Sequence, residues 1–141
     1  MSGPYFEIEW AIEACSWTLA EDTGSGFVSR GTVTLPAGTR TTTGHLAALV
    51  IALNAASGSV GSYTLSPWGQ SPSTERAVQR WSIVAGYTSS FTWRLTSGSG
   101  SDRSKIGLDA STITSDAHKT VTPASWIYGI WAPPDYSFKD D

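Results

Sequence analysis

The chain has 141 residues, a formal net charge of −3 and a pI of about 5.2. Charged residues make up only 15%, which excludes an ordinary helical bundle because the exposed faces of such bundles are filled with Glu, Lys and Arg. The basic residues are scattered, which argues against direct nucleic-acid binding, and the longest apolar stretch, 46–56, is too short to cross a membrane. We expect one water-soluble domain, made in the cytoplasm without a signal peptide.

The first segment alternates between apolar and acidic residues. Phe6, Ile8, Trp10 and Ile12 fall on one side, and Glu7, Glu9 and Glu13 on the other. Period two predicts a half-buried strand. The apolar set then continues in the other parity from Cys15, which predicts a bulge or a sharp bend at 14–15.

A turn and a second strand follow. Residues 21–26 have turn composition, and the strand at 27–35 is predicted to point Phe27, Val33 and Leu35 inward. These features predict a hairpin with the first segment.

One helix is predicted at 43–56. Leu46, Leu49 and Leu53 recur at helical spacing, Thr42 or Thr43 is the expected cap, and Gly58 lies where the helix should stop. Its alanines allow close approach to a sheet.

The second half predicts further strands and little helix. Strands are expected at 60–66, 78–85 and 91–96, and one helical turn at 102–108 with Asp102 as its cap. The predicted fold is mainly β: an antiparallel β-sandwich or curled sheet with one covering α-helix. We expect a domain over 1–122 and an aromatic, Pro-rich arm over 123–141 that packs on its own domain or on a neighbour.

No residue pattern indicates a catalytic or metal site, and no cofactor is expected. His45 and His118 lack further ligands at metal-binding spacing, and His45 should be solvated or partly packed in the first helical turn. The single cysteine, Cys15, is expected to be a small buried apolar residue. Glu7 and Glu9 share a strand face at a spacing that two-carboxylate hydrolases use, but nothing around them would raise a pKa, so we interpret them as solvated. The chain is therefore predicted not to be an enzyme.

The seven tryptophans suggest contact surfaces. Those in phase with apolar neighbours are predicted to be core: Trp10, Trp17, Trp81 and Trp93. The others lie in loop or arm and are candidates for subunit contacts, together with nearby residues. The predicted interface is Trp126, Tyr128, Trp131, Pro133, Pro134 and Tyr136, with Trp68 second. Alternatively, the arm closes its own core, or exposed tryptophans stack on sugar rings of a glycan.

The order of several short motifs resembles the short virion structural proteins of tailed bacteriophages. The motifs are 35–41 (LPAGTRT), the helix ending in 53–56 (LNAA), 91–93 (FTW), 105–108 (KIGL) and 128–134 (YGIWAPP). In those proteins the fourth motif ends in an aromatic residue, which is replaced here by Leu108. The resemblance covers roughly 32–134.

That resemblance implies a non-enzymatic building block of a virion. It implies other virion proteins as partners, a homo-oligomeric assembly, and a place in the tail, baseplate or neck slightly ahead of capsid decoration. A carbohydrate- or receptor-binding module using exposed Trp stays open as the alternative from another class.

Overall fold

The protein is described here by a computed structural model, which gives the backbone of residues 6–7, 9–70, 79–121 and 130–131 and the side chains of 9–66 and 82–121. The elements are β1 (Phe6–Glu7), β2 (Trp10–Ile12), β3 (Cys15–Asp22), β4 (Phe27–Leu35), β5 (Gly38–Arg40), α1 (Thr42–Ser57), β6 (Tyr63–Gln70), β7 (Gln79–Ala85), β8 (Thr92–Ser97), the 3-10 helix η1 (Ser101–Ile106), β9 (Thr112–Thr114), β10 (Thr120–Val121) and β11 (Ile130–Trp131). In these ranges every strand pairing is antiparallel, with neighbours in the orders β4-β3-β8-β9, β10-β7-β6, β2-β5 and β1-β11.

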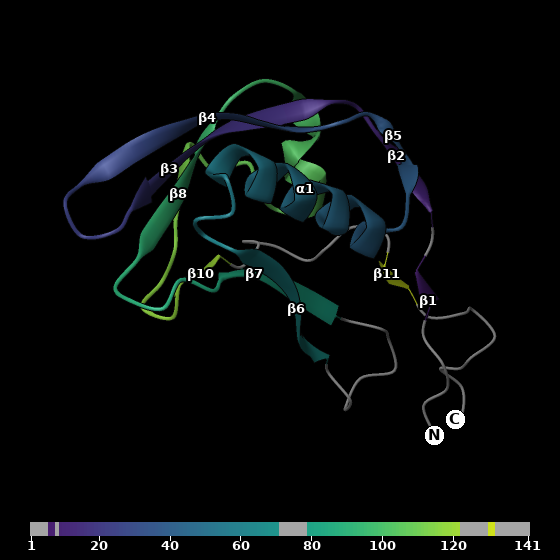
Figure 1. Cartoon of the computed structure of the whole chain (residues 1–141). Coiled ribbons are helices and arrows are strands. Elements are labelled where there is room, and N and C mark those ends of the chain that lie inside the picture. The colour runs from purple at the N-terminus through teal and green to yellow at the C-terminus, as the bar shows by residue number, and fades with distance from the viewer. Residues whose placement is uncertain (1–5, 8, 71–78, 122–129, 132–141) are drawn as a thin grey trace.

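Helix α1 lies between the four-stranded and the three-stranded sheet (Figure 1). Leu46, Leu49 and Leu53 are its buried leucines, and they meet apolar side chains from both sheets. The fold class is confirmed as mainly β, a curled antiparallel sheet with a covering helix, and the described strands form no closed barrel.

One long hairpin forms the spine of the four-stranded sheet. Cys15 faces Leu35 in the β3–β4 ladder and Ile12 faces Gly38 in the β2–β5 ladder, so the same register continues through both. The ladder is interrupted at 13–14, opposite 36–37, where Pro36 has no N–H to donate. The predicted irregularity at 14–15 is therefore a break in the strand one residue earlier.

A bulge near the hairpin tip was not predicted. Leu19 faces Gly31 and Ala20 faces Ser29, which leaves Arg30 as the extra residue, next to Gly31 at φ +94°. Glycine adopts this backbone conformation without the steric cost that other residues incur.

The bulge explains why the inward placement of Phe27 was wrong. Val33 and Leu35 are buried as predicted, but the extra residue moves Phe27 to the outer face, where its side chain is 38% exposed. There the Arg94 guanidinium lies 4.0 Å from the Phe27 ring centroid. A one-residue slip reverses the side-chain parity of every residue beyond it.

The outer face of the four-stranded sheet carries a row of threonines. Strand register places Thr32, Thr18, Thr96 and Thr112 side by side across β4, β3, β8 and β9, and all four are exposed. Within the described ranges, the outer face is therefore mostly polar and solvated, with Phe27 as an exposed apolar residue on it. This observation favours the curled-sheet form of the prediction over a sandwich.

The helix extends one residue beyond the predicted 43–56 at each end. Its cap is Thr41, whose Oγ1 accepts a hydrogen bond from the Gly44 N–H at 3.0 Å. Neither predicted cap serves. Thr42 is buried instead, and its Oγ1 accepts a hydrogen bond from Trp10 Nε1 at 2.9 Å. Gly58 ends the helix in the left-handed conformation, as its position predicted.

The described part of the arm, residues 130–131, pairs with the start of the chain. Phe6 pairs with Trp131 and Glu7 with Ile130, so β11 runs beside β1 within one chain. Trp10, Trp17 and Trp93 are core residues as predicted, while the side chain of Trp81 lies outside the described residues.

Candidate functional site

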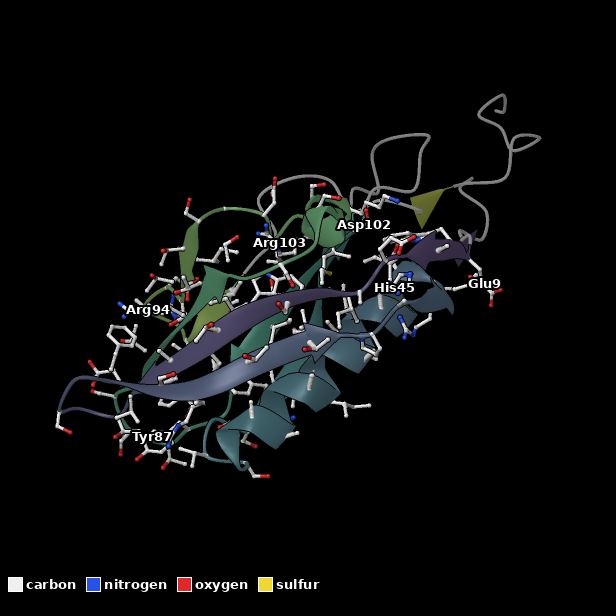
Figure 2. All side chains as sticks on the ribbon, turned by 90° about the horizontal axis from the view of Figure 1, so that it is seen from above. Glu9, His45, Tyr87, Arg94, Asp102 and Arg103 are labelled. Atoms are coloured by element: carbon white, nitrogen blue, oxygen red, sulfur yellow. The ribbon has the colours of Figure 1, made fainter. Side chains whose placement is uncertain are left out.

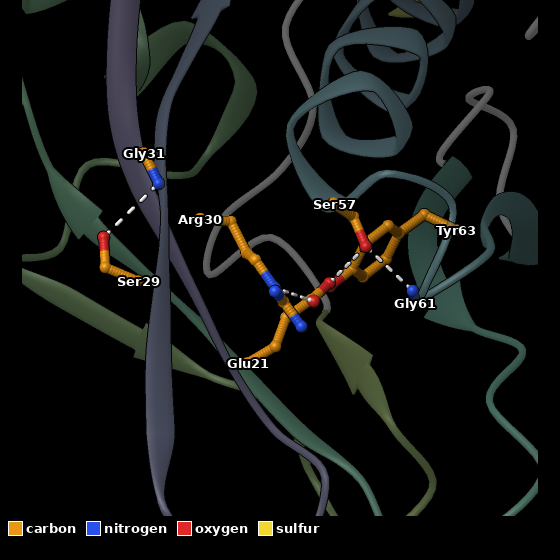
Figure 3. A network of polar contacts seen from close by, with 7 residues as sticks. All are labelled: Glu21, Ser29, Arg30, Gly31, Ser57, Gly61 and Tyr63. Carbon is orange, nitrogen blue, oxygen red and sulfur yellow. Dashed lines mark hydrogen bonds and ion pairs between the residues drawn. The ribbon is translucent and has the colours of Figure 1, made fainter.

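A buried carboxylate near the hairpin tip is the centre of the densest polar network (Figure 3). The Glu21 side chain is fully buried in β3. Its Oε1 accepts a hydrogen bond from Arg30 Nε at 2.7 Å, and its Oε2 accepts from Ser57 Oγ at 2.6 Å and from the Tyr63 hydroxyl at 2.5 Å. Four elements, β3, β4, α1 and β6, thus meet on one carboxylate.

The partners of Glu21 are themselves held in place. Ser57 Oγ also accepts a hydrogen bond from the Gly61 N–H at 2.8 Å, and the Tyr63 ring packs edge-on against Trp93 with centroids 4.7 Å apart. Burial raises the pKa of the Tyr63 phenol far above its ordinary value of 10.0, and the hydrogen bond to Glu21 adds to the increase. Tyr63 therefore remains a hydrogen-bond donor at physiological pH, which suits a structural tie.

His45 is the centre of a second network, at the start of α1. It is fully buried, which corrects the prediction of a solvated or partly packed residue. Its Nδ1 lies 2.9 Å from Arg40 Nη1 and its Nε2 lies 2.9 Å from the Trp10 carbonyl oxygen. Since a guanidinium can only donate and a carbonyl can only accept, Nδ1 is the acceptor and Nε2 carries the proton.

That arrangement keeps the His45 imidazole neutral. Burial is the main cause that lowers its pKa below the ordinary 6.5, and the Arg40 charge acts in the same direction. The hydrogen bond to the Trp10 carbonyl opposes them. Through these contacts His45 links α1 to β2 and β5.

Asp102 is the centre of a third network. Its Oδ2 accepts a hydrogen bond from the Glu13 N–H at 2.7 Å and lies 3.5 Å from Lys105 Nζ. The prediction that Asp102 caps its helical turn is wrong, because Gly100 occupies the cap position of η1 and no side chain caps it. The carboxylate instead satisfies the backbone at the break between β2 and β3.

Cys15 is buried beside this network, as predicted. Burial, and secondly the Asp102 charge, raise the pKa of its thiol from 9.0 to about 11. A thiolate is the reactive form of cysteine, so this environment makes Cys15 inert.

An open, polar pocket of about 450 Å³ lies between the loop after β7 and the turn before β10. It is separate from the three networks and is lined by Thr88, Ser89, Ser90, Phe91, Thr92, Asp116, Ala117 and Lys119.

The structure does not test the predicted contact residues, because their side chains lie outside the described residues. Trp68 lies in β6 and Trp131 in β11, but the side chains of both lie outside the described residues. The other predicted contact residues lie entirely outside the described residues: Trp126, Tyr128, Pro133, Pro134 and Tyr136. Glu9 is exposed, while the side chain of Glu7 is not described. In the described ranges no group of three or more His, Cys, Asp or Glu side chains is placed to hold a metal ion, and no helix is long and apolar enough to span a membrane.

The roles of Glu21, His45 and Asp102 as structural centres were not predicted from the sequence. Glu21 was assigned to a polar turn, and its partners lie 9, 36 and 42 residues away in the sequence. No local pattern reports such contacts.

No protein-family model matches the chain, and no match was found among curated proteins or among solved structures.

Proposed function

We propose that the chain is a structural subunit of a tailed-phage virion that assembles with copies of itself and with other virion proteins. A tail, baseplate or neck position is slightly preferred, and capsid decoration is the alternative within the same class. The motif order over 32–134 supports this proposal, as does the use of Glu21, His45 and Asp102 as internal ties. Such ties favour a rigid body whose contacts can repeat identically around a symmetry axis.

The observation that carries the proposal is the exposed apolar edge of the long hairpin. Val28 is 52% exposed and Phe27 is 38% exposed at the start of β4. Among the described strands β4 pairs only with β3, so no described strand lies along its other edge. Open edges of this kind are templates for pairing with another chain.

A second copy of the same chain is the occupant that we propose for this edge. Two β4 strands related by a two-fold axis would pair antiparallel, each supplying the same segment to the other, so no different partner is required. The bulge at Arg30 limits such pairing to one side or the other of the slip, which gives the contact a defined register. Phe27 and Val28, which lie beyond the bulge, would add apolar area to such a contact.

The C-terminal arm is the second proposed contact element. The predicted contact residues Trp126, Tyr128, Trp131, Pro133, Pro134 and Tyr136 would anchor it, because buried aromatics dominate interface energies. Since β11 pairs with β1 in the same chain, residues after 131 are the part that can be removed without losing that pairing.

The test is the molar mass in solution, measured by light scattering, of the intact chain and of the chain ending at residue 131. A discrete oligomer is expected for the intact protein over micromolar concentrations. If the shortened chain becomes a folded monomer, residues 132–141 carry the contacts, and if it keeps the oligomer, the contacts lie within residues 1–131. A monomer for the intact chain at every concentration would contradict self-assembly.

A further inference from the structure

The open pocket has two walls with different chemistry. One wall is the loop after β7, which carries three successive hydroxyl side chains, those of Thr88, Ser89 and Ser90. The other wall is the turn at 116–119, which supplies Asp116 and Lys119. Its volume of about 450 Å³ is within the range of small-molecule sites, about 300–1,000 Å³.

The turn that forms the second wall is rigid. The Lys119 N–H donates to the Asp116 carbonyl at 3.0 Å, and the Asp116 N–H donates to the Thr120 carbonyl at 2.9 Å. Asp116 Oδ1 accepts from the N–H groups of His118, at 2.8 Å, and Thr120, at 3.1 Å. These bonds fix the Asp116 carboxylate before any ligand arrives, which lowers the entropy cost of binding.

Lys119 also holds the two walls together. Its Nζ donates to the Tyr87 carbonyl at 2.6 Å, while its own carbonyl accepts from the Ala85 N–H at 3.0 Å and from Trp93 Nε1 at 3.0 Å. An ammonium group has three N–H donors, so two remain after the bond to Tyr87. The pocket is therefore preformed, with donors already oriented.

The charges in the pocket balance. Asp116 contributes one negative charge and Lys119 one positive charge, and the remaining polar lining residues are neutral hydroxyls. A divalent cation would need several oxygen ligands with more negative charge than one carboxylate supplies, and a phosphate would be repelled by Asp116. The fitting ligand is neutral and carries several hydroxyl groups that both donate and accept.

An aromatic pair lies at the base of the loop wall. Phe91 lines the pocket, is 6% exposed, and stacks on Tyr87 with ring centroids 4.9 Å apart and an interplanar angle of 25°. Tyr87 is half-buried, and its position is labelled in Figure 2. A small apolar area next to hydroxyl, carboxylate and ammonium groups matches the surface of a sugar ring, which has apolar C–H groups and polar edges.

We propose that this pocket binds one neutral saccharide unit, with Asp116 accepting hydrogen bonds from its hydroxyls and Lys119 donating to them. The exposed hydroxyls of Thr88, Ser89 and Ser90 contact the outer edge of the sugar. This function is additional to assembly and does not depend on it. It also uses a different surface from the tryptophans of the arm, so the two can be tested separately.

The test is a titration of the intact, isotopically labelled protein with glucose, galactose and N-acetylglucosamine, followed by amide chemical shifts. The expected result is saturable shifts at 88–92 and 116–119 for at least one sugar, with a dissociation constant on the order of 1 mM, as expected for a ligand of about a dozen heavy atoms. The same sugar at the end of an oligosaccharide should bind as well or better if the natural source is a polymer, and more weakly if it is the free sugar.

Three variants complete the test. Asp116→Asn keeps an oxygen for the turn but removes the charge, and should weaken binding about tenfold. Ala117→Trp fills the pocket and should abolish binding. The matched control Asp109→Asn changes an exposed carboxylate outside the pocket lining and should leave binding unchanged.

The results that would overturn the proposal are equally defined. They are no localised shifts with any of the three sugars at 50 times the expected dissociation constant (on the order of 50 mM), equal shifts with glycerol at the same concentration, or full binding by a folded Ala117→Trp variant. Amide spectra of each variant report whether it is folded, so a failure to fold is not mistaken for lost binding.

Discussion

Arg30 Nε donates a hydrogen bond to Glu21 Oε1 at 2.7 Å, and Arg30 is the extra residue of the bulge in the β3–β4 ladder. The bulge and the ion pair are therefore one feature. Bulges commonly redirect a side chain, and here the redirected side chain reaches a carboxylate that would otherwise be buried without a counter-charge. This pair joins the hairpin tip to the network of Ser57 and Tyr63.

Removing the Glu21 charge should destabilise the fold more than any surface change. We expect Glu21→Gln to lower the free energy of unfolding by about 3 kcal/mol, because it leaves Arg30 without its counter-charge and places an amide against two hydroxyl donors. Chemical denaturation followed by tryptophan fluorescence measures the change. Glu13→Gln, an exposed position, is the control and should shift stability by less than about 0.5 kcal/mol. Equal stability of the Glu21 variant and the wild type would contradict the network's role.

His45 should make the fold sensitive to acid. Its pKa is lowered in the folded state, so the unfolded chain binds more protons once the pH falls below about 6.5. Stability is full above that pH and declines as the pH falls towards the folded pKa, by at most about 1.4 kcal/mol per pH unit for one group. Unfolding free energies at pH 7.5, 6.5 and 5.5 measure the effect.

Two histidine variants isolate the source of that decline. His45→Gln retains an acceptor for Arg40 and a donor for the Trp10 carbonyl, so it should lower stability at pH 7.5 but remove most of the decline between pH 6.5 and 5.5. His118→Gln changes the exposed histidine and should leave the decline intact. A decline that persists in His45→Gln and disappears in His118→Gln would show that His118, and not His45, causes it.

Gly100 should tolerate no side chain. It has φ +94°, and an added Cβ would lie 2.6 Å from the Ala14 carbonyl oxygen and 2.6 Å from Cys15 Cβ. Gly24 also has a positive φ, +133°, but has nothing within 4 Å of an added Cβ. We expect Gly24→Ala to cost about 1–2 kcal/mol for its backbone conformation alone, and Gly100→Ala to cost clearly more because of the overlap. Thermal unfolding midpoints compare the two, and equal losses would contradict the close approach.

Thr41 should stabilise α1 as its N-cap residue. Thr41→Ala should lower stability by about 1 kcal/mol because the Gly44 N–H loses its acceptor. Thr41→Ser keeps the hydroxyl and should retain most of that stability. Circular dichroism during denaturation checks both variants, and a Ser variant as unstable as the Ala variant would show that the hydroxyl does not cap the helix.

The hairpin, the helix and the mainly β class could be predicted because each leaves a periodic trace in the sequence. Alternation placed Trp10, Ile12, Val33 and Leu35 on the buried face, and helical spacing located α1 to within one residue at each end. These patterns can be recognised because the periodic spacing of apolar residues along the sequence reflects which side chains become buried.

The candidate sites could not be predicted, because they depend on a bulge and on contacts between residues far apart in the sequence. Arg30 gives no sign in the sequence that it is an extra residue in the ladder, and the misplaced Phe27 follows from that one slip. Asp102 has the ordinary sequence signature of a helix cap, yet it bonds Glu13, 89 residues away. The pocket likewise joins residues 88–92 to 116–119 through Lys119, a contact that only the strand order brings about.

Molar mass by light scattering of three folded proteins tests whether the open edge of β4 joins copies of this chain. Val28→Lys places a charge on the exposed edge, the device by which natural strands prevent edge pairing. Ile51→Lys changes the 71% exposed Ile51 of α1 and serves as the matched control. We expect an oligomer for the wild type and Ile51→Lys, and a smaller species for Val28→Lys. An oligomer of unchanged mass in Val28→Lys, or a monomeric wild type, would contradict this expectation.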